Sequence, residues 1–262
     1  MPKRFPIGLT FLAALMLQLG PTPSKSDPLP SAYIAIIIDD IGHNRVRGMQ
    51  AIDLPASLTY AVIPDTRHST GLARYAHRAG KEVMIHLPMA NMRNQPMSEI
   101  ALTQGLTRND FLHVIDRALI RVPFARGINN HMGSLLTQEP EAMSWLMESV
   151  RHRKMFFVDS RTTHKTVASH VARQKNVLSA SRDVFLDNDR TLFEIDRQFR
   201  RLLKLARRRG TAIAIGHPYR STLQYLTHAI PILEQEDIKV ISISEMIQRR
   251  LAKQQIAAKT SF

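Results

Sequence analysis

The strongest constraint on the fold is a series of short apolar runs in which apolar and polar residues do not alternate. Runs that are apolar throughout are expected to be buried on both faces, in a parallel sheet joined by helical crossovers. The runs lie at residues 33–38, 58–63, 82–87, 126–129, 155–158, 184–186, 211–215 and 239–243. Stretches of helical periodicity separate them, near residues 68–80, 107–121, 138–153, 163–175, 190–209, 220–236 and 244–254.

Seven or eight such strand and helix units predict an α/β fold. A distorted (β/α)7–8 barrel is the leading architecture, ahead of an open, doubly wound sheet. With 262 residues, 44% of them hydrophobic, the chain is long enough for one large core. We expect a single barrel domain over residues 27–252 and a loose C-terminal tail over residues 253–262.

The first residues carry the pattern of a secretory signal peptide. Lys3 and Arg4 precede an apolar run over residues 5–19, and small residues follow near Ser24 to Ser26. The run of about 15 residues is short for a membrane span, which needs about 20. We therefore expect residues 1–26 to be removed and the protein to be periplasmic or secreted, with an uncleaved membrane anchor as the alternative. No stable membrane span is expected after processing.

The charge balance fits an exported protein. Thirty-six Lys and Arg against 22 Asp and Glu leave a formal charge of +14. In an envelope, a basic surface such as that of the amphipathic stretch 190–209 suits anionic polymers rather than nucleic acid, although a solvated helix face is the simpler interpretation. The chain has no cysteine, which excludes thiolate metal ligands and cysteine nucleophiles.

Polar residues gather where the apolar runs end. In a barrel the carboxyl ends of the strands converge on one face, where barrel enzymes keep their active sites. The residues at these ends are Asp39, Asp40, His86, Asn130, His131, Asp159, Asp187, Asp189 and His217. Each aspartate alone could cap the next helix, and each histidine alone could be a hydrogen-bonded core residue. As a set, three histidines and a carboxylate pair indicate a metal or acid–base site.

The residue types indicate the chemistry. Imidazole nitrogens with one carboxylate suit zinc or a similar divalent ion, and a catalytic site leaves a position open for water. One of two adjacent aspartates can then bind the ion while the other accepts a proton, and a separate histidine can protonate a leaving group. This equipment suits metal-assisted hydrolysis of an amide or ester, and a metal-dependent phosphoesterase is a weaker alternative.

Five short motifs together resemble a known family. They are IIIDDIG, the strand-end histidine of MIHLPM, NHMGS, the DS step of FFVDS and the late GHP. The combination is similar to the divergent polysaccharide deacetylases, relatives of the NodB-homology carbohydrate esterases, over about residues 32–248. The resemblance implies a distorted barrel of the glycoside hydrolase and deacetylase type that binds zinc or another divalent metal. It also implies removal of N- or O-acetyl groups from envelope glycans.

The resemblance also implies residue roles. By match of motif, Asp39 is the general base, Asp40 a metal ligand and His217 the general acid. The better-known relatives carry two histidine ligands in an H-[ST]-x-x-H stretch, whereas NHMGS offers only His131. His86 is the candidate for the second, an arrangement that resembles the YdjC-like carbohydrate deacetylases.

Three further residues are expected to orient ligands or substrate: Asn130, Asp159 and Ser160. The Arg-x-Pro-Tyr motif of the better-known relatives is missing, and RVPF at 121–124 precedes His131 rather than following it. This absence motivates a second hypothesis, a weak or inactive barrel that serves as a glycan-binding or envelope-assembly factor.

Overall fold

The computed structural model describes Met1 and residues 31–233 and 235–260. The expected signal peptide, residues 1–26, lies outside these residues apart from Met1. Within the described part of the chain, no helix has both the length and the apolar character needed to cross a membrane.

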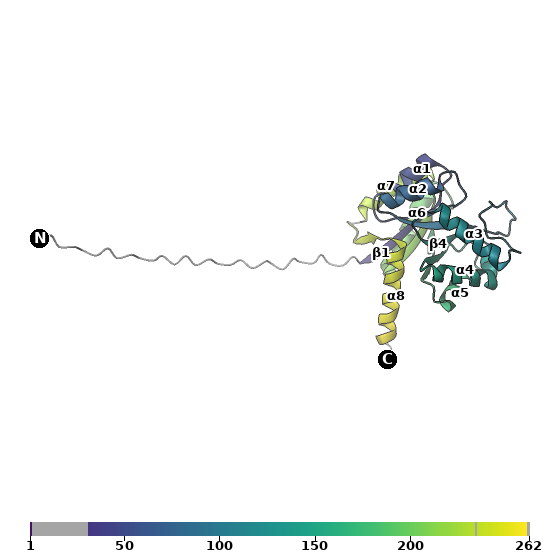
Figure 1. Cartoon of the computed structure of the whole chain (residues 1–262). Helices are drawn as coiled ribbons and strands as arrows, with labels where there is room; N and C mark the ends of the chain where they lie inside the picture. The colour runs from purple at the N-terminus through teal and green to yellow at the C-terminus, as the bar shows by residue number, and fades with distance from the viewer. Residues whose placement is uncertain (2–30, 234, 261–262) are drawn as a thin grey trace.

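The chain alternates strands and helices almost throughout (Figure 1). The strands are β1 (Ala32–Ile41), β2 (Thr59–Val62), β3 (Glu82–Met89), β4 (Ala125–Met132), β5 (Phe156–Asp159), β6 (Ser179–Ser181), β7 (Val184–Phe185), β8 (Thr211–Gly216) and β9 (Ile238–Val240). The helices are α1 (Arg45–Ile52), α2 (Ser69–Arg78), α3 (Arg108–Arg121), α4 (Pro140–His152), α5 (Ala168–Gln174), α6 (Leu192–Arg209), α7 (Arg220–Ile232) and α8 (Ile243–Thr260), with a short 3-10 turn at Leu136–Gln138.

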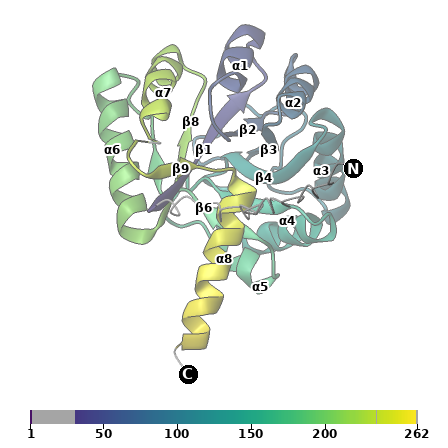
Figure 2. The ribbon, with the colours of Figure 1, turned by 90° about the vertical axis from the view of Figure 1, so that its left-hand side faces the viewer.

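All strand pairs are parallel, and the sheet runs in the order β6-β5-β4-β3-β2-β1-β8-β7, with β9 added beside the start of β1. The sheet curls into a half-barrel whose ends are β6 and β7. Figure 2 shows α1 to α7 arranged around the outside of this curled sheet. The α/β barrel expected from the apolar runs is therefore confirmed, in an open form.

The strands have an outer and an inner face, both apolar. On β1, Ile34 and Ile36 belong to the outer core beneath the helices, whereas Ala35 and Ile37 point into the barrel. The inner core is completed by the first turns of α8, which begins at the centre of the ring of strands (Figure 2). Its buried residues there are Ile243, Met246 and Ile247. One end of the barrel is thereby closed by the chain's last helix.

The chain's first described residues lie at the same closed end. Ser31 donates hydrogen bonds from its backbone N and its Oγ to Asp237, each 3.0 Å long, and β9 pairs with Ala32–Ile34 directly after it. The amino ends of the strands are thus joined to the segment between α7 and α8.

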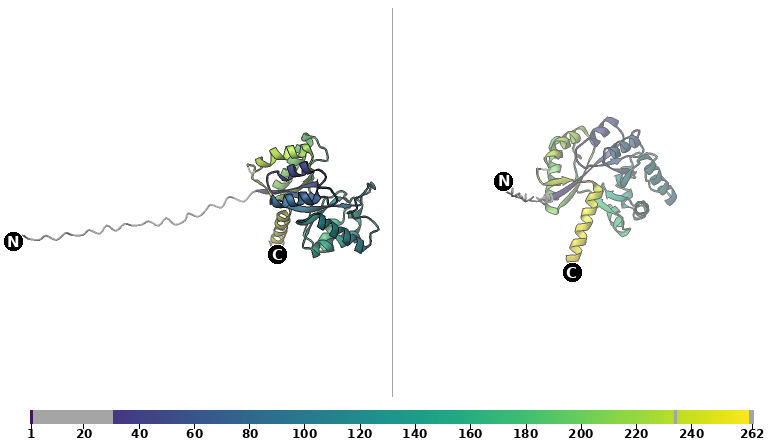
Figure 3. Two further views of the ribbon diagram at one scale, coloured as in Figure 1. Left: turned by 45° about the horizontal axis from the view of Figure 1, so that its top comes forward. Right: turned by 60° about the vertical axis from the view of Figure 1, so that its left-hand side comes forward.

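Several boundaries differ from the sequence-based expectation. Helix α1 and strand β6 were not expected, because α1 contains Gly48 and β6 is only three residues long. Strand β4 continues to Met132 and so includes Asn130 and His131. The expected loose tail is helical as far as Thr260, and these last turns of α8 extend beyond the barrel (Figure 3).

Candidate active site

A β-bulge on β1 places the two adjacent carboxylates in the same opening. Ile38 pairs with Tyr60 and Ile41 with Val62, so Asp39 and Asp40 together face a single residue of β2. Asp40 adopts a φ of 56°, a left-handed conformation that few residues other than glycine take up readily. Because the bulge inserts one residue, both side chains turn into the mouth, the opening at the carboxyl ends of the strands.

Asp40, His86 and His131 form a compact cluster in the mouth. His131 Nδ1 lies 3.0 Å from His86 Nε2 and 3.1 Å from Asp40 Oδ1, and His86 Nε2 lies 3.3 Å from the same oxygen. Ligands about 2.0–2.1 Å from a tetrahedral ion lie about 3.3 Å from one another. The three side chains are thus close to the spacing that a zinc-like ion requires, and they form a group that could hold a metal.

The chemistry of the cluster agrees with its spacing. Asp40 Oδ1 is buried, yet no donor among the described residues makes a hydrogen bond with it. Although the nitrogens of His131 and His86 lie 3.1 and 3.3 Å away, this buried carboxylate oxygen accepts no well-aligned hydrogen bond, and such an oxygen is costly unless a cation neutralises it. Two imidazole nitrogens and one carboxylate oxygen are also the ligand types that zinc prefers. The residues present therefore fit a divalent metal.

Asn129 links the cluster to Asp39. Its side-chain oxygen lies 2.8 Å from His86 Nδ1, and its Nδ2 donates a 2.8 Å hydrogen bond to Asp39 Oδ1. Because the amide oxygen can only accept, His86 Nδ1 carries the proton and Nε2 is left to face Asp40. One amide thus fixes the tautomer of a candidate ligand and the orientation of the neighbouring carboxylate.

The surroundings of the two aspartates shift their pKa values in opposite directions. Burial raises the pKa of Asp39 above its ordinary value. Burial acts on Asp40 in the same direction, but the imidazoles of His131 and His86 outweigh it and hold the pKa of Asp40 well below its ordinary value. Asp40 is therefore the stably ionised member, as a ligand should be, and Asp39 is the more basic one.

His217 also lies near Asp40, and a buried carboxylate, that of Asp187, holds it in place. Its Nδ1 lies 2.8 Å from Asp187 Oδ1, and its Nε2 lies 3.8 Å from Asp40 Oδ2. Asp187 also accepts a hydrogen bond from Thr222 Oγ1. Burial would lower the pKa of His217, but Asp187 outweighs it and raises this pKa. The protonated imidazole can thus present Nε2–H to the mouth.

Two aromatic rings stack on His217, and an arginine lies over each of them. Phe185 and Tyr219 lie nearly parallel to the imidazole, with ring centroids at 5.3 and 5.2 Å. Arg182 lies over Phe185 at 4.7 Å, and Arg190 lies over Tyr219 at 3.8 Å. We call these five side chains the His217 stack. The stack fixes the plane of the imidazole and brings two positive charges beside it.

The three residues expected to orient ligands have different positions. Ser160 Oγ accepts a 3.3 Å hydrogen bond from Asn129 and so lies next to the cluster. Asn130 instead accepts from the backbone N of Ser160 and donates to the backbone of Met132. Asp159 accepts from the backbone N of Arg161 and from the hydroxyls of Thr166 and Ser169. Asn130 and Asp159 thus stabilise the loop after β5 rather than contact the candidate ligands.

Two residues of the site were missed from the sequence. Asn129 was placed at the end of a strand and Asn130 was preferred, although side chains alternate and only Asn129 can share a face with His131. Asp187 was noted at a strand end but was given no role. The signal in its case was FLDND, a carboxylate directly after an apolar run.

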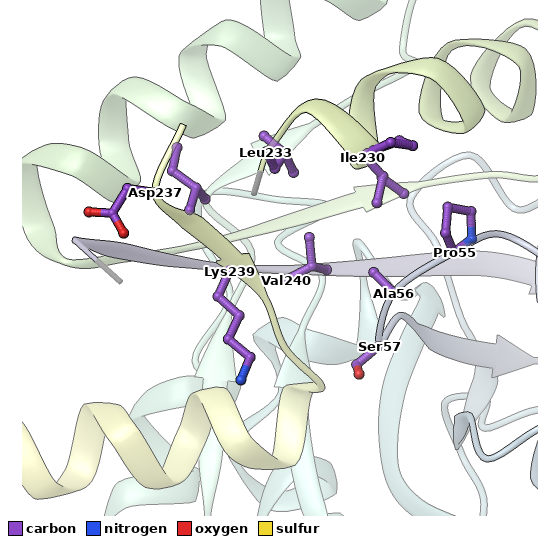
Figure 4. A pocket seen from close by; sticks show the side chains of 10 residues that line it. Pro55, Ala56, Ser57, Ile230, Leu233, Asp237, Lys239 and Val240 are labelled. Carbon is purple, nitrogen blue, oxygen red and sulfur yellow. The ribbon is translucent and has the colours of Figure 1, made fainter. Parts of the chain in front are cut away.

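A cavity of about 540 Å³ lies at the other end of the sheet (Figure 4). Pro55, Ala56 and Ser57 line it together with the end of α7 and strand β9. These segments lie at the amino ends of β1 and β2, away from the mouth. The cavity contains none of the site residues described above.

Solved structures with the same architecture support the fold. An uncharacterized protein of Agrobacterium tumefaciens C58, ATU2773, superposes with a TM-score of 0.80 at 20% identity, over 85% of this chain and 91% of that one. The peptidoglycan deacetylase PdaC of Bacillus subtilis superposes with a TM-score of 0.54 at 13% identity, over 87% and 96%. These likenesses concern the arrangement of strands and helices.

Sequence comparisons identify the family. The chain is 36% identical over 222 residues to the uncharacterized protein YibQ of Escherichia coli K12, covering 85% of this chain and 69% of that protein. It is 32% identical over 213 residues to an uncharacterized protein of Haemophilus influenzae, covering 81% and 76%. The model of the divergent polysaccharide deacetylases matches residues 36–247, nearly the whole barrel. The resemblance found in the motifs is thus confirmed, and the chain belongs to the divergent polysaccharide deacetylase family.

Proposed function

We propose that this chain is an exported, metal-dependent carbohydrate deacetylase that hydrolyses N- or O-acetyl groups of envelope glycans. The observation that carries the proposal is the convergence of Asp40, His86 and His131 around a buried carboxylate oxygen with no hydrogen bond. The ligand types favour zinc. The basic and apolar pattern of residues 1–26 supports export.

The metal and the chain contribute different chemistry. When bound by Asp40, His86 and His131, the ion supplies Lewis acidity, which polarises an acetyl carbonyl and acidifies water. Asp39 accepts the proton of the attacking water, since its raised pKa makes it the better base of the pair. Its Oδ1 is occupied by Asn129, which leaves Oδ2 for this transfer.

His217 completes the reaction on the leaving-group side. With Nδ1 held by Asp187, its protonated form donates the Nε2 proton to the departing amine or hydroxyl as the bond to the acetyl carbon breaks. The rings of Phe185 and Tyr219 keep the imidazole in place while this proton leaves.

Metal content and acetate release together test the proposal. Purified protein should contain about one zinc per chain, and His131→Ala should lose it, whereas His164→Ala, in an exposed loop position, should keep it. Asp39→Asn should keep the metal and lower acetate release from acetylated chitooligosaccharide or peptidoglycan fragments by about 10²–10⁴-fold. Wild type that binds no divalent ion would show the site assignment to be wrong. Glycan binding without release would favour the glycan-binding factor.

A further inference from the structure

One side of the mouth carries a group of five arginines. Among the described residues, none of them makes an ion pair with an aspartate or glutamate. They are Arg45 and Arg47 at the start of α1, Arg182 before β7, Arg190 after β7 and Arg220 at the start of α7. By contrast, several arginines on the outer surface of α6 are paired, such as Arg197 with Glu194 and Arg200 with Asp196.

The position of these arginines runs against the usual preference of helices. The first turn of a helix favours acidic residues, because the helix dipole is positive there. Helices α3, α4, α6 and α8 follow this rule, whereas α1, α2, α5 and α7 have no acidic residue in their first turns. Helix α1 follows the strand that carries Asp40, and α7 follows His217, so the basic first turns of these two helices add positive charge on this side of the mouth.

Arg190 has the geometry of a binding residue. The carbon atom of its guanidinium lies over the ring of Tyr219, 3.8 Å from the ring centroid, and Tyr219 in turn stacks on His217. A stacked guanidinium keeps its N–H groups at the edge of its plane, where they can bind a carboxylate through two parallel hydrogen bonds. Arg190 is exposed, so a ligand can reach these donors.

Arg182 has a different part. Its Nε and Nη2 donate to the backbone oxygens of Ser160 and Arg161, at 2.7 and 3.0 Å. With these donors used inside the protein, Arg182 contributes charge rather than a free binding edge. Of the two arginines in the His217 stack, Arg190 is thus the one that can take up a ligand.

We propose that the substrate of this site is an acetylated glycan that carries a carboxylate, and that Arg190 binds this carboxylate while the acetyl group lies between Asp40 and His217. This inference rests on the proposed function for the acetyl group, but it assigns the direct contact with the anion to Arg190. It makes Arg190 a specificity-determining residue that takes no part in the proton transfers.

A matched pair of probes tests the proposal. One is the disaccharide of N-acetylglucosamine and N-acetylmuramic acid, and the other is the same disaccharide with its carboxylate converted to the carboxamide. Wild type should prefer the carboxylate by about tenfold in kcat/KM, through KM, and Arg190→Gln should remove this preference. Arg190→Lys should retain part of it. Arg151→Gln removes the same charge from the last turn of α4, at the opposite end of the barrel, and should keep the full preference.

The outcomes separate this proposal from the proposed function. Equal use of both probes by wild type, or an equal loss on both in Arg190→Gln, would overturn it. If neither probe releases acetate, the proposed function fails on these glycans, and calorimetric binding of the two probes decides. Tighter binding of the carboxylate that depends on Arg190 then supports the inference, and equal binding of both overturns it.

Discussion

Asp187 holds His217 at two points, through Oδ1 to the ring Nδ1 at 2.8 Å and through Oδ2 to the backbone N at 2.7 Å. A carboxylate that binds both the ring and the backbone of one histidine leaves the imidazole little freedom to rotate. The same carboxylate favours the protonated ring, which is the form a general acid needs.

We therefore expect Asp187→Asn to impair the acid without removing the metal. The amide keeps the size of the side chain but loses the negative charge that stabilises protonated His217. Acetate release should fall by about 10²-fold or more, mainly in kcat, while zinc content stays at the wild-type level. Asp189→Asn, two residues away on the surface, is the control and should behave as wild type. Loss of zinc in Asp187→Asn would contradict the separate roles of the metal cluster and of His217.

The bridge made by Asn129 gives a second prediction. Asn129→Asp replaces the amide that donates to Asp39 Oδ1 by a carboxylate at the same 2.8 Å distance. Two adjacent carboxylates raise each other's pKa, so Asp39 becomes protonated and loses its role as base. We expect acetate release to fall at least about tenfold at neutral pH with zinc retained. Asn94→Asp, in an exposed loop, is the matched control, and an active Asn129→Asp enzyme would argue against Asp39 as base.

Metal binding should release a proton. Burial would lower the pKa of His86, but Asp39 and Asp40 outweigh burial and raise it to about 9, above its ordinary value of 6.5. In metal-free protein at pH 7 the ring is thus protonated, and an ion must displace that proton to reach Nε2. Zinc affinity should then increase about tenfold per pH unit between pH 7 and the pKa, and level off above it. Calorimetry in buffers of different ionisation enthalpy measures the proton directly, and affinity that is constant from pH 7 to 9 would exclude this coupling.

The plug formed by α8 gives a prediction on stability. Met246 is fully buried inside the barrel with Ile243 and Ile247. Met246→Ala should lower the free energy of unfolding by about 2–5 kcal/mol, because it removes buried side-chain volume and leaves a cavity. Gln254→Ala, on the exposed part of the same helix, should change it by less than about 0.5 kcal/mol. Denaturant unfolding of the two variants checks this, and equal stability would show that the start of α8 adds little to the core.

The sequence was most informative where one physical rule decided the outcome. Uninterrupted apolar runs separated by helical stretches favour parallel strands buried on both faces, and the convergence of their carboxyl ends then brings His86, His131 and His217 together. These histidines come from β3, β4 and the end of β8, far apart in the chain, and the rule needs no knowledge of the turns between them.

The sequence was least informative where local backbone geometry decides the direction of a side chain. The residues of IIIDDIG do not predict the β-bulge at Asp40. Without the bulge the two aspartates would point to opposite faces of the sheet. The same alternation puts the side chains of Asn129 and Asn130 on opposite faces of β4. The strand was expected to end at Asn129, so the alternation was not applied to the residues after it. The role of Asp187 depends on its contact with His217. That contact arises because β7 and β8 pair in the sheet, which the sequence does not reveal.

The hydrogen bonds between Ser31 and Asp237 have a practical meaning for work with this protein. They fix the beginning of β1 at the closed end of the barrel, so the whole length of the strands separates this point from the site. Attachment of the chain ahead of Ser31 to a fluorophore, a solid support or a lipid surface would place that group next to the closed end. The mouth would then face outward, toward whatever polymer lies beyond.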